Sequence, residues 1–157
     1  MKKPLFIFLW LLFLANISPA EASTALPKAV TTEHEMVVTA NPLATAAGTK
    51  ILQLGGTAVD AMIAAQAVLG LVEPQSSGIG GGAFVVYYDA ATGTLTTFDA
   101  REKAPAAARA ERFLAEDSTP LDFVNAWQSG RAVGVPGVPK LLEYTHPRYG
   151  KLPWQRL

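Results

Sequence analysis

The sequence predicts an α+β fold in which apolar helices pack against a β-sheet. Two segments, residues 43–54 and 58–71, carry apolar side chains in patterns typical of helices. A third segment, residues 84–99, consists of two β-prone runs separated by a turn. Because each of these elements presents apolar surface that needs a covering layer, we expect stacked layers around one core.

The composition indicates one globular domain without a nucleic-acid partner. Of the 157 residues 50% are hydrophobic, and 13 basic residues balance 13 acidic residues. This length suits a single domain, and a neutral chain lacks the basic surplus expected of nucleic-acid-binding proteins. The sequence contains no cysteine, which excludes disulfides and thiolate-bound metals.

The first 22 residues are typical of a secretory signal. Lys2 and Lys3 form a basic start, Leu5–Ala15 is an apolar core, and Ala20-Glu21-Ala22 is a small-x-small cleavage site. An uncleaved membrane anchor is the alternative, but the apolar core is shorter than the roughly 20 residues of a membrane span.

We therefore expect a secreted or periplasmic protein that begins at Ser23 and has no stable membrane span. Residues 23–35 are predicted to form an extended lead-in. A first strand is then expected over Met36–Ala40.

Two helices are expected next in the chain. Asn41 is a suitable cap and Pro42 a suitable first residue for a helix that ends at Gly55-Gly56. Thr57 and Asp60 have the spacing of a capping box at the start of a second helix, which reaches about residue 71. This second helix is apolar on nearly all sides, so we expect it to be buried.

The glycine-rich run at residues 78–82 has two interpretations. Gly78-Ile79-Gly80-Gly81-Gly82-Ala83 fits the Gly-x-Gly-x-x-Ala pattern of dinucleotide-binding loops. That pattern requires a strand before it and a helix after it, whereas the order expected here is the reverse. A tight connection between layers is therefore the favoured interpretation.

A β-hairpin is predicted after the glycines. Phe84–Tyr88 and Thr94–Asp99 are the strands, and Asp89–Gly93 is the loop between them. Both faces of the first strand are largely apolar, so we expect both to be covered.

Arg101, directly after the hairpin, is the candidate binding residue. The guanidinium fork of arginine fits a carboxylate in two-pronged fashion. Since Asp99 and Glu102 flank it, the residue pattern leaves two roles open: a structural ion pair, or a clamp for a substrate carboxylate.

The remainder of the chain predicts short elements. They are an alanine-rich connection at 104–110, a helical turn at 111–114, a loop at 116–130, a turn-rich strand end at 131–139, a helix that begins with residues 139–144 and is stopped by Pro147, and another element starting at 151. The two histidines, His34 and His146, lack metal-ligand spacing and are expected to be surface residues.

Several motifs resemble the large subunit of γ-glutamyltranspeptidases. They are Gly55-Gly56-Thr57-Ala58-Val59-Asp60-Ala61, Glu73-Pro74 with Ser76-Ser77-Gly78-Ile79-Gly80-Gly81-Gly82, Asp99-Ala100-Arg101-Glu102-Lys103-Ala104-Pro105, Val133-Gly134-Val135-Pro136-Gly137 and Tyr149-Gly150-Lys151-Leu152-Pro153-Trp154. They occur in the family's order, and the resemblance extends from about Met36 to the end of the chain.

The resemblance implies a fold and a reaction. Residues 36–157 would be the N-terminal portion of a large-subunit domain, forming part of the αββα sandwich of N-terminal-nucleophile hydrolases. The family transfers γ-glutamyl groups from glutathione to water or amino acids, without a metal or organic cofactor. Its nucleophile is a threonine that becomes the N-terminus of a small subunit after self-cleavage, so the resemblance implies no catalytic residue within these 157 residues. Arg101 matches the arginine that binds the substrate α-carboxylate.

Two other functions remain open at this point. Related proteins cleave other acyl groups, such as cephalosporin side chains. The chain could instead be a truncated fragment, inactive or acting as a binding piece. Whether the coding sequence continues past Leu157 to a Thr-Thr-His-like segment would separate a precursor from such a fragment.

Overall fold

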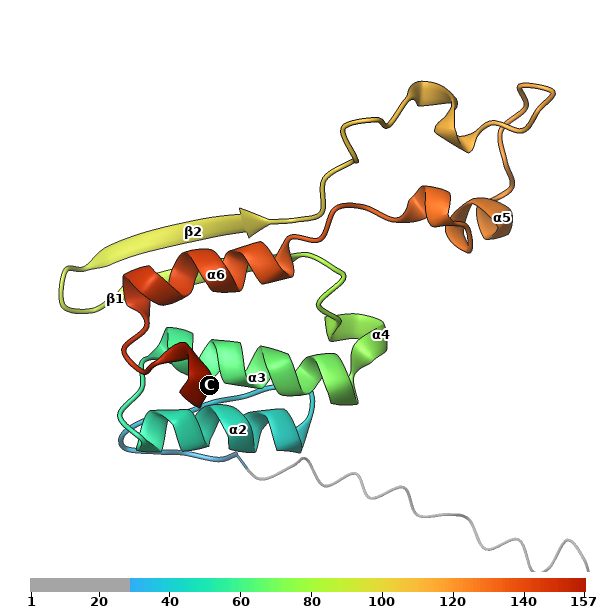
Figure 1. The fold of residues 1–157 in the computed structure, drawn as a ribbon. Helices are drawn as coiled ribbons and strands as arrows, with labels where there is room; N and C mark the ends of the chain where they lie inside the picture. The colour runs from blue at the N-terminus through green and yellow to red at the C-terminus, as the bar shows by residue number, and fades with distance from the viewer. Residues whose placement is uncertain (1–28) are drawn as a thin grey trace, which may run out of the picture. The chain divides into compact units, whose positions relative to one another are not determined.

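The computed structural model describes residues 29–157 (Figure 1). The predicted signal sequence, residues 1–22, lies outside this range, as does the start of the predicted lead-in. By compactness the chain divides after Thr32, and the residues from Glu33 onward form one unit. No helix in the described part of the chain is long and apolar enough to cross a membrane.

The predicted first strand at Met36–Ala40 is wrong. This segment is not hydrogen-bonded into a sheet, and Val38 is 80% exposed. Within residues 29–157 the two strands of the hairpin pair only with each other, so no strand edge reaches this segment. Val37 still packs against the helical core.

Helix α2, Pro42–Gln53, confirms the first predicted helix. The Asn41 side chain accepts a hydrogen bond of 3.0 Å from the Leu43 amide, and Pro42 occupies the first turn. The helix ends where Gly55 adopts a φ of +83°, a backbone conformation that glycine reaches without steric cost.

Helix α3, Ala58–Val72, confirms the second predicted helix and its capping box. The Thr57 hydroxyl accepts from the Asp60 amide at 3.2 Å, and the Asp60 carboxylate accepts from the Thr57 amide at 2.9 Å. The buried residues lie in its first half: Val59, Asp60, Ala61, Ile63, Ala64 and Ala65. Leu71 in the last turn is exposed, so the prediction of burial holds for the first half of the helix.

The predicted hairpin is confirmed to within one residue at each strand end. After the short helix α4, Pro74–Ser77, strands β1, Ala83–Asp89, and β2, Thr94–Ala100, pair antiparallel. Val85 lies opposite Phe98 in this register, and Gly93 has a φ of +68° in the loop.

The prediction that both faces of the first strand are covered is wrong for the described chain. The side chains of Phe84, Val86 and Tyr88 are 62–69% exposed. The opposite face packs on the helix after residue 137, where Phe98 makes edge contacts with Tyr144 and Tyr149. The described residues supply a covering helix on this side of the hairpin only.

Helix α6, Val138–Tyr149, is longer than predicted, because Pro147 lies inside it and does not stop it. Proline has no N–H, so the intrahelical bond to the Glu143 carbonyl is missing, and the helix continues for only two residues beyond Pro147. The end of the helix is held instead by Gly150, whose amide donates to the His146 carbonyl at 2.8 Å. The short 3₁₀ helix η3, Trp154–Arg156, follows.

Three short helices lie between β2 and α6. The 3₁₀ helix η1, Ala110–Phe113, confirms the predicted helical turn, but the predicted loop at 116–130 contains helix α5, Phe123–Trp127, and the start of η2, Gly130–Ala132. Asp122 caps α5 by accepting from the Val124 and Asn125 amides at 3.1 Å.

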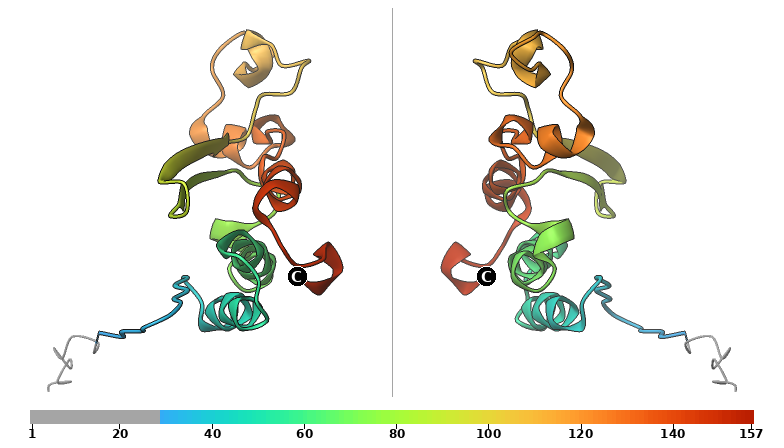
Figure 2. Two further views of the ribbon diagram at one scale, coloured as in Figure 1. Left: turned by 90° about the vertical axis from the view of Figure 1, so that its left-hand side faces the viewer. Right: turned by 90° about the vertical axis from the view of Figure 1, so that its right-hand side faces the viewer.

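The helices and the hairpin form layers, and the described residues thus have the predicted α+β class. Helix α3 lies between α2 and α6, and α6 runs along the hairpin (Figures 1 and 2). The prediction that the two apolar helices pack against the sheet is therefore wrong, because α2 and α3 pack mainly on each other and α6 covers the hairpin. A core cluster of Ile51, Ala61 and Ala64 is packed by Val37, Leu52, Leu152 and Leu157. Residues 151–157, here called the C-terminal segment, therefore pack against the α2–α3 pair through Leu152 and Leu157.

Candidate functional site

Arg101 follows the last residue of β2 and projects into solvent. Its side chain is 71% exposed. Its backbone amide donates to the Asp99 carboxylate at 2.9 Å, and this bond sets the direction in which the chain leaves the strand. Arg101 therefore stands at one end of the hairpin sheet, which is open on one face.

The Arg101 guanidinium has one ion-pair partner among residues 29–157. Its Nε lies 3.3 Å from Oε2 of Glu102. Exposed ion pairs contribute about 0–1 kcal/mol, so this contact alone does little for stability. Because it uses Nε, the two terminal nitrogens remain available for a two-pronged carboxylate.

Arg101 lines an open pocket of about 490 Å³. Its walls are the end of β2, the turn at residues 135–137 and the first half of α6. Lys103 and Lys140 add two further cations, and Asp99 is the acid among the lining residues. Lys140 also pairs with Glu143 at 2.7 Å, and this hydrogen bond holds the pKa of Glu143 below its usual value. Because Glu102 and Glu143 pair with two of the three cations, the terminal guanidinium nitrogens of Arg101 are the feature that suits the pocket to an anionic ligand.

Glycines allow two backbone segments to approach the end of β2, next to Arg101. A Cβ on Gly82 would lie 2.8 Å from the Arg101 Cα, and one on Gly137 would lie 1.8 Å from the Ala100 carbonyl oxygen. Neither position can hold a larger residue without moving β2. The position of Arg101 is therefore fixed largely by main-chain packing.

The glycine run also caps helix α6. The Gly81 carbonyl accepts from the amides of Gly137 at 3.0 Å and Val138 at 3.2 Å. The run is preceded by α4 and followed by β1, the reverse of the order that a dinucleotide loop requires. The predicted role as a tight connection agrees with this geometry.

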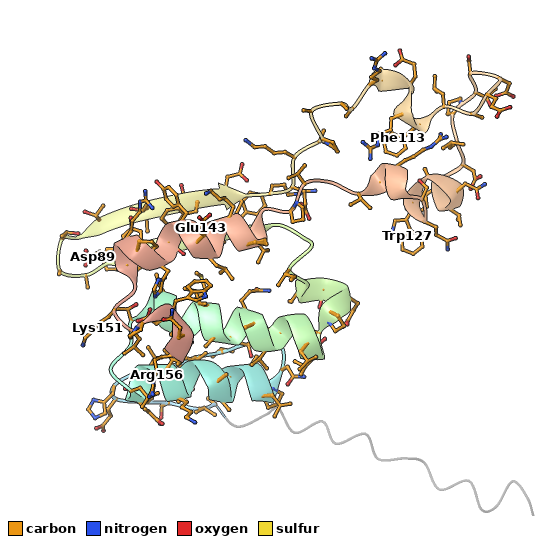
Figure 3. The ribbon with its side chains drawn as sticks, in the orientation of Figure 1. Asp89, Phe113, Trp127, Glu143, Lys151 and Arg156 are labelled. Carbon is orange, nitrogen blue, oxygen red and sulfur yellow. The ribbon has the colours of Figure 1, made fainter. Side chains whose placement is uncertain are left out.

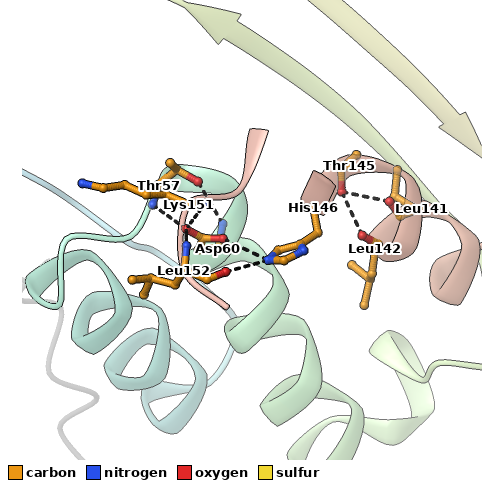
Figure 4. A network of polar contacts seen from close by, with 8 residues as sticks. All are labelled: Thr57, Asp60, Leu141, Leu142, Thr145, His146, Lys151 and Leu152. Atoms are coloured by element: carbon orange, nitrogen blue, oxygen red, sulfur yellow. Dashed lines mark hydrogen bonds and ion pairs between the residues drawn. The ribbon is translucent and has the colours of Figure 1, made fainter. Parts of the chain in front are cut away.

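A second polar cluster is centred on the buried carboxylate of Asp60 (Figure 4). Besides the Thr57 amide, its Oδ2 accepts from the amides of Lys151 at 2.9 Å and Leu152 at 3.2 Å. Burial by itself raises the pKa of Asp60, but these hydrogen bonds outweigh it and leave the pKa below its ordinary value. The carboxylate therefore stays ionised and joins the start of α3 to the C-terminal segment.

His146 belongs to this cluster, and the prediction that it is a surface histidine is wrong. Its Nε2 lies 2.9 Å from the Leu152 carbonyl oxygen and 3.7 Å from Asp60 Oδ1, and its side chain is only 18% exposed. A carbonyl can only accept, so Nε2 carries a proton. His34 is exposed as predicted.

Sequence reasoning found Arg101 but missed its neighbours and the role of Asp60. Lys140 reaches the pocket from α6, 39 positions along the numbering from Arg101, and no local pattern connects them. Asp60 did leave a signal, since it is the single acid in helix α3. Its partners lie 91 and 92 residues away and are backbone amides, which carry no sequence signature.

Comparison with known proteins places these features in a family. The family model for gamma-glutamyltranspeptidase matches residues 44–157. The chain is 45% identical over 115 residues to the glutathione hydrolase proenzyme of Bacillus subtilis, covering 73% of this chain and 20% of that protein. It thus spans about a fifth of the length of this relative.

Solved structures agree with this assignment. Gamma-glutamyltranspeptidase from Pseudomonas nitroreducens, complexed with L-DON, superposes with a TM-score of 0.73 at 33% identity, covering 80% of this chain and 37% of that chain. Cephalosporin acylase from Bacillus halodurans superposes with a TM-score of 0.56 at 28% identity, covering 81% and 24%. The family match covers most of the chain, including Arg101 and the Asp60 cluster, and the chain therefore belongs to the gamma-glutamyltranspeptidase family.

Proposed function

We propose that this chain is the N-terminal part of a glutathione hydrolase precursor that transfers γ-glutamyl groups from glutathione to water or amino acids. Family membership and the relative in Bacillus subtilis support the reaction class. In this proposal residues 36–157 begin the large subunit, and residues 1–22 direct export to the periplasm or the medium. The catalytic threonine comes from a small subunit produced by self-cleavage.

The observation that carries the proposal is the exposed guanidinium of Arg101, whose terminal nitrogens face an open pocket. A γ-glutamyl compound presents an α-carboxylate at a fixed distance from the amide that is cleaved. The terminal nitrogens of Arg101 would bind that carboxylate and hold the γ-carbonyl in place for attack. Lys103, which also lines the pocket, adds a positive charge that attracts the anion.

The bond-making groups belong to the small subunit in this proposal. The threonine hydroxyl attacks the γ-carbonyl while its own α-amine takes the hydroxyl proton. The α-amine then passes this proton to the substrate amide nitrogen, the C–N bond breaks, and the released amine of the substrate leaves a γ-glutamyl ester on the threonine. Water or an amino acid then takes the acyl group from the ester. The residues of this chain bind and orient the substrate, and no step requires a metal or organic cofactor.

The complete fold proposed is the αββα sandwich of N-terminal-nucleophile hydrolases. The exposed apolar side chains of Phe84, Val86 and Tyr88 support it, since a sheet face of this kind needs a covering layer. The described helices would form one outer layer, and further strands outside this sequence would complete the sheets.

The experiment that tests this function uses the full precursor with Arg101→Lys. Lysine keeps the charge but cannot offer the planar fork. Losing a charged hydrogen bond costs roughly 1.5–3 kcal/mol, which corresponds to roughly tenfold or more in kcat/KM for a γ-glutamyl substrate. Self-cleavage should be nearly unaffected, because that step uses no free substrate.

A Glu102→Gln variant is the matched control. It removes the ion pair but leaves the guanidinium in place, so KM should change little if Arg101 is a clamp. If Arg101 serves a structural ion pair instead, both variants should lower the melting temperature and impair processing. An unchanged KM in the Lys variant would contradict the clamp.

Acylase activity of the cephalosporin type is the second candidate, favoured by the similarity to the acylase from Bacillus halodurans. Assays of the precursor with a γ-glutamyl anilide and with an acyl-cephalosporin distinguish the two candidate activities. A preference for the γ-glutamyl compound that disappears in the Arg101 variants supports the first proposal, and a preference for the cephalosporin supports the second.

A further inference from the structure

Three arginines gather at a site separate from the Arg101 pocket. Arg109, Arg112 and Arg131 line a depression of about 500 Å³ formed within residues 107–131. Glu111 is the acid among its lining residues, so three positive charges face one negative charge. The lining shares no residue with the pocket of Arg101.

Two of these arginines hold each other's backbone in a reciprocal arrangement, here called the arginine clasp. The Arg112 side chain donates from Nε to the Arg131 carbonyl and from Nη2 to the Gly130 carbonyl at 3.2 Å. The Arg131 side chain donates from Nη1 to the carbonyls of Arg112 at 3.3 Å and Leu114 at 3.0 Å. The clasp connects η1 to η2 across the segment that contains α5.

The clasp orients charge without neutralising it. Its acceptors are neutral carbonyls, and within residues 29–157 no ion pair involves Arg109, Arg112 or Arg131. A guanidinium has five N–H donors, so each clasp arginine keeps donors beyond those bonded to carbonyls. The result is a group of oriented cations with unused donors beside an open depression.

We propose that this depression binds a phosphate group. Guanidinium forks match the oxygens of phosphate, and several arginines around one ligand suit a dianion better than a single carboxylate. Because the clasp already orders two of the side chains, binding loses less conformational entropy than it would with free arginines. The phosphate is either a free phosphate ion or monoester, or the headgroup of an anionic phospholipid.

Equilibrium dialysis of the 157-residue chain against radiolabelled inorganic phosphate, at constant ionic strength, tests the proposal. This measurement does not depend on whether the chain is monomeric. The expected result is saturable binding at one site. Arg109 makes none of the clasp bonds, so Arg109→Gln removes a charge and leaves the clasp intact.

We expect Arg109→Gln to raise the Kd for phosphate about fivefold, as for the loss of ~1 kcal/mol from one charge near the ligand in a solvated site. Arg156→Gln is the matched control, because it removes the same charge from η3, outside the depression. Glu111→Gln should lower the Kd by a similar factor. Trp127 lies on α5, which contacts η2 (Figure 3). With Trp10 and Trp154 replaced by Phe, its emission provides a second reading of the same titrations.

A purely structural clasp predicts different results. It would give no saturable phosphate binding, or the same loss of phosphate affinity in Arg156→Gln as in Arg109→Gln. Either outcome overturns the proposal. Co-sedimentation with vesicles of phosphatidic acid but not phosphatidylcholine, lost in Arg109→Gln, identifies a lipid headgroup. Dialysis binding without co-sedimentation identifies a free phosphate compound.

Discussion

Asp60 joins two parts of the chain that are distant in sequence. It caps α3 and also accepts hydrogen bonds from two amides of the C-terminal segment. A fully buried carboxylate of this kind is stable only while its partners stay in place. Its replacement should therefore affect the packing of elements that are distant in sequence.

We predict that Asp60→Asn lowers the free energy of unfolding by roughly 1.5–3 kcal/mol, the usual range for hydrogen bonds to a charged group. Asparagine keeps the size of the side chain but removes the charge, and it places a donor toward the protonated Nε2 of His146. Thermal melts of the two chains measure the effect. Glu116→Gln, at an exposed position, is the control and should melt like the wild type.

The same carboxylate predicts a dependence of stability on pH. Its folded pKa lies below the ordinary value of 3.8, so its stabilisation is complete above that value and is lost as pH falls through the folded pKa. Urea midpoints of the wild type and Asp60→Asn should differ by a constant amount at neutral pH. The difference should shrink once the pH drops below about 3.8. A gap that persists in acid would contradict an ionised Asp60.

Gly150 gives a steric test of the same cluster. A Cβ there would lie 2.7 Å from Asp60 Oδ1 and 2.6 Å from His146 Cδ2, whereas a Cβ on Gly80 would meet nothing within 4 Å. We expect Gly150→Ala to destabilise the chain by about 1–3 kcal/mol, as for other overpacked sites. Gly80→Ala should change stability by less than about 0.5 kcal/mol. Equal melting temperatures for the two variants would exclude the predicted clash.

At the scale of elements, the features that depend on neighbouring residues could be predicted, and those that depend on contacts between distant residues could not. The starts of α2 and α3 follow from Asn41, Pro42 and the Thr57–Asp60 box, all of which act within one helical turn. The hairpin follows from its β-prone runs and Gly93. The length of α6 was missed because the helix continues for two residues past Pro147. It ends where the Gly150 amide donates to the His146 carbonyl.

The candidate site was predicted only in part for the same reason. Arg101 stands directly after a predictable strand and so could be singled out. The pocket around it forms when the turn at residues 135–137 and Lys140 of α6 pack against the end of β2. Their approach depends on the close backbone contacts at Gly82 and Gly137, which no local pattern reveals.

The hairpin faces provide a prediction that compares the chain with the full precursor. Val86 is exposed in the chain, and Val85 lies on the face covered by α6. Val86→Thr should change the stability of the chain by less than about 0.5 kcal/mol. In the precursor, where a second layer is proposed to cover this face, it should cost about 1–3 kcal/mol for the buried hydroxyl.

Val85→Thr is the control for this comparison, because it should destabilise both proteins. Thermal melts of the chain and the precursor with each substitution give the four values. A Val86 variant that is neutral in the precursor would contradict the proposed sandwich.

At the scale of the whole molecule, the proposal divides the work of catalysis between two polypeptides. This chain would bind the substrate, and the threonine outside these 157 residues would attack it. We therefore predict that the purified chain releases no chromophore from a γ-glutamyl anilide. The assay is read against an Arg101→Ala chain, and turnover above that background would show that the chain contains a nucleophile of its own.

The position of the Asp60 partners also has a consequence for the order of events during synthesis. Asp60 leaves the ribosome 91 residues before the Lys151 amide that it binds. At about 5–20 residues per second this interval lasts about 5–20 s. During that time α2 and α3 can pair, but the carboxylate has only its own capping bonds and must remain hydrated. The start of α3 therefore stays in contact with water until the C-terminal segment emerges and its amides bind the Asp60 carboxylate.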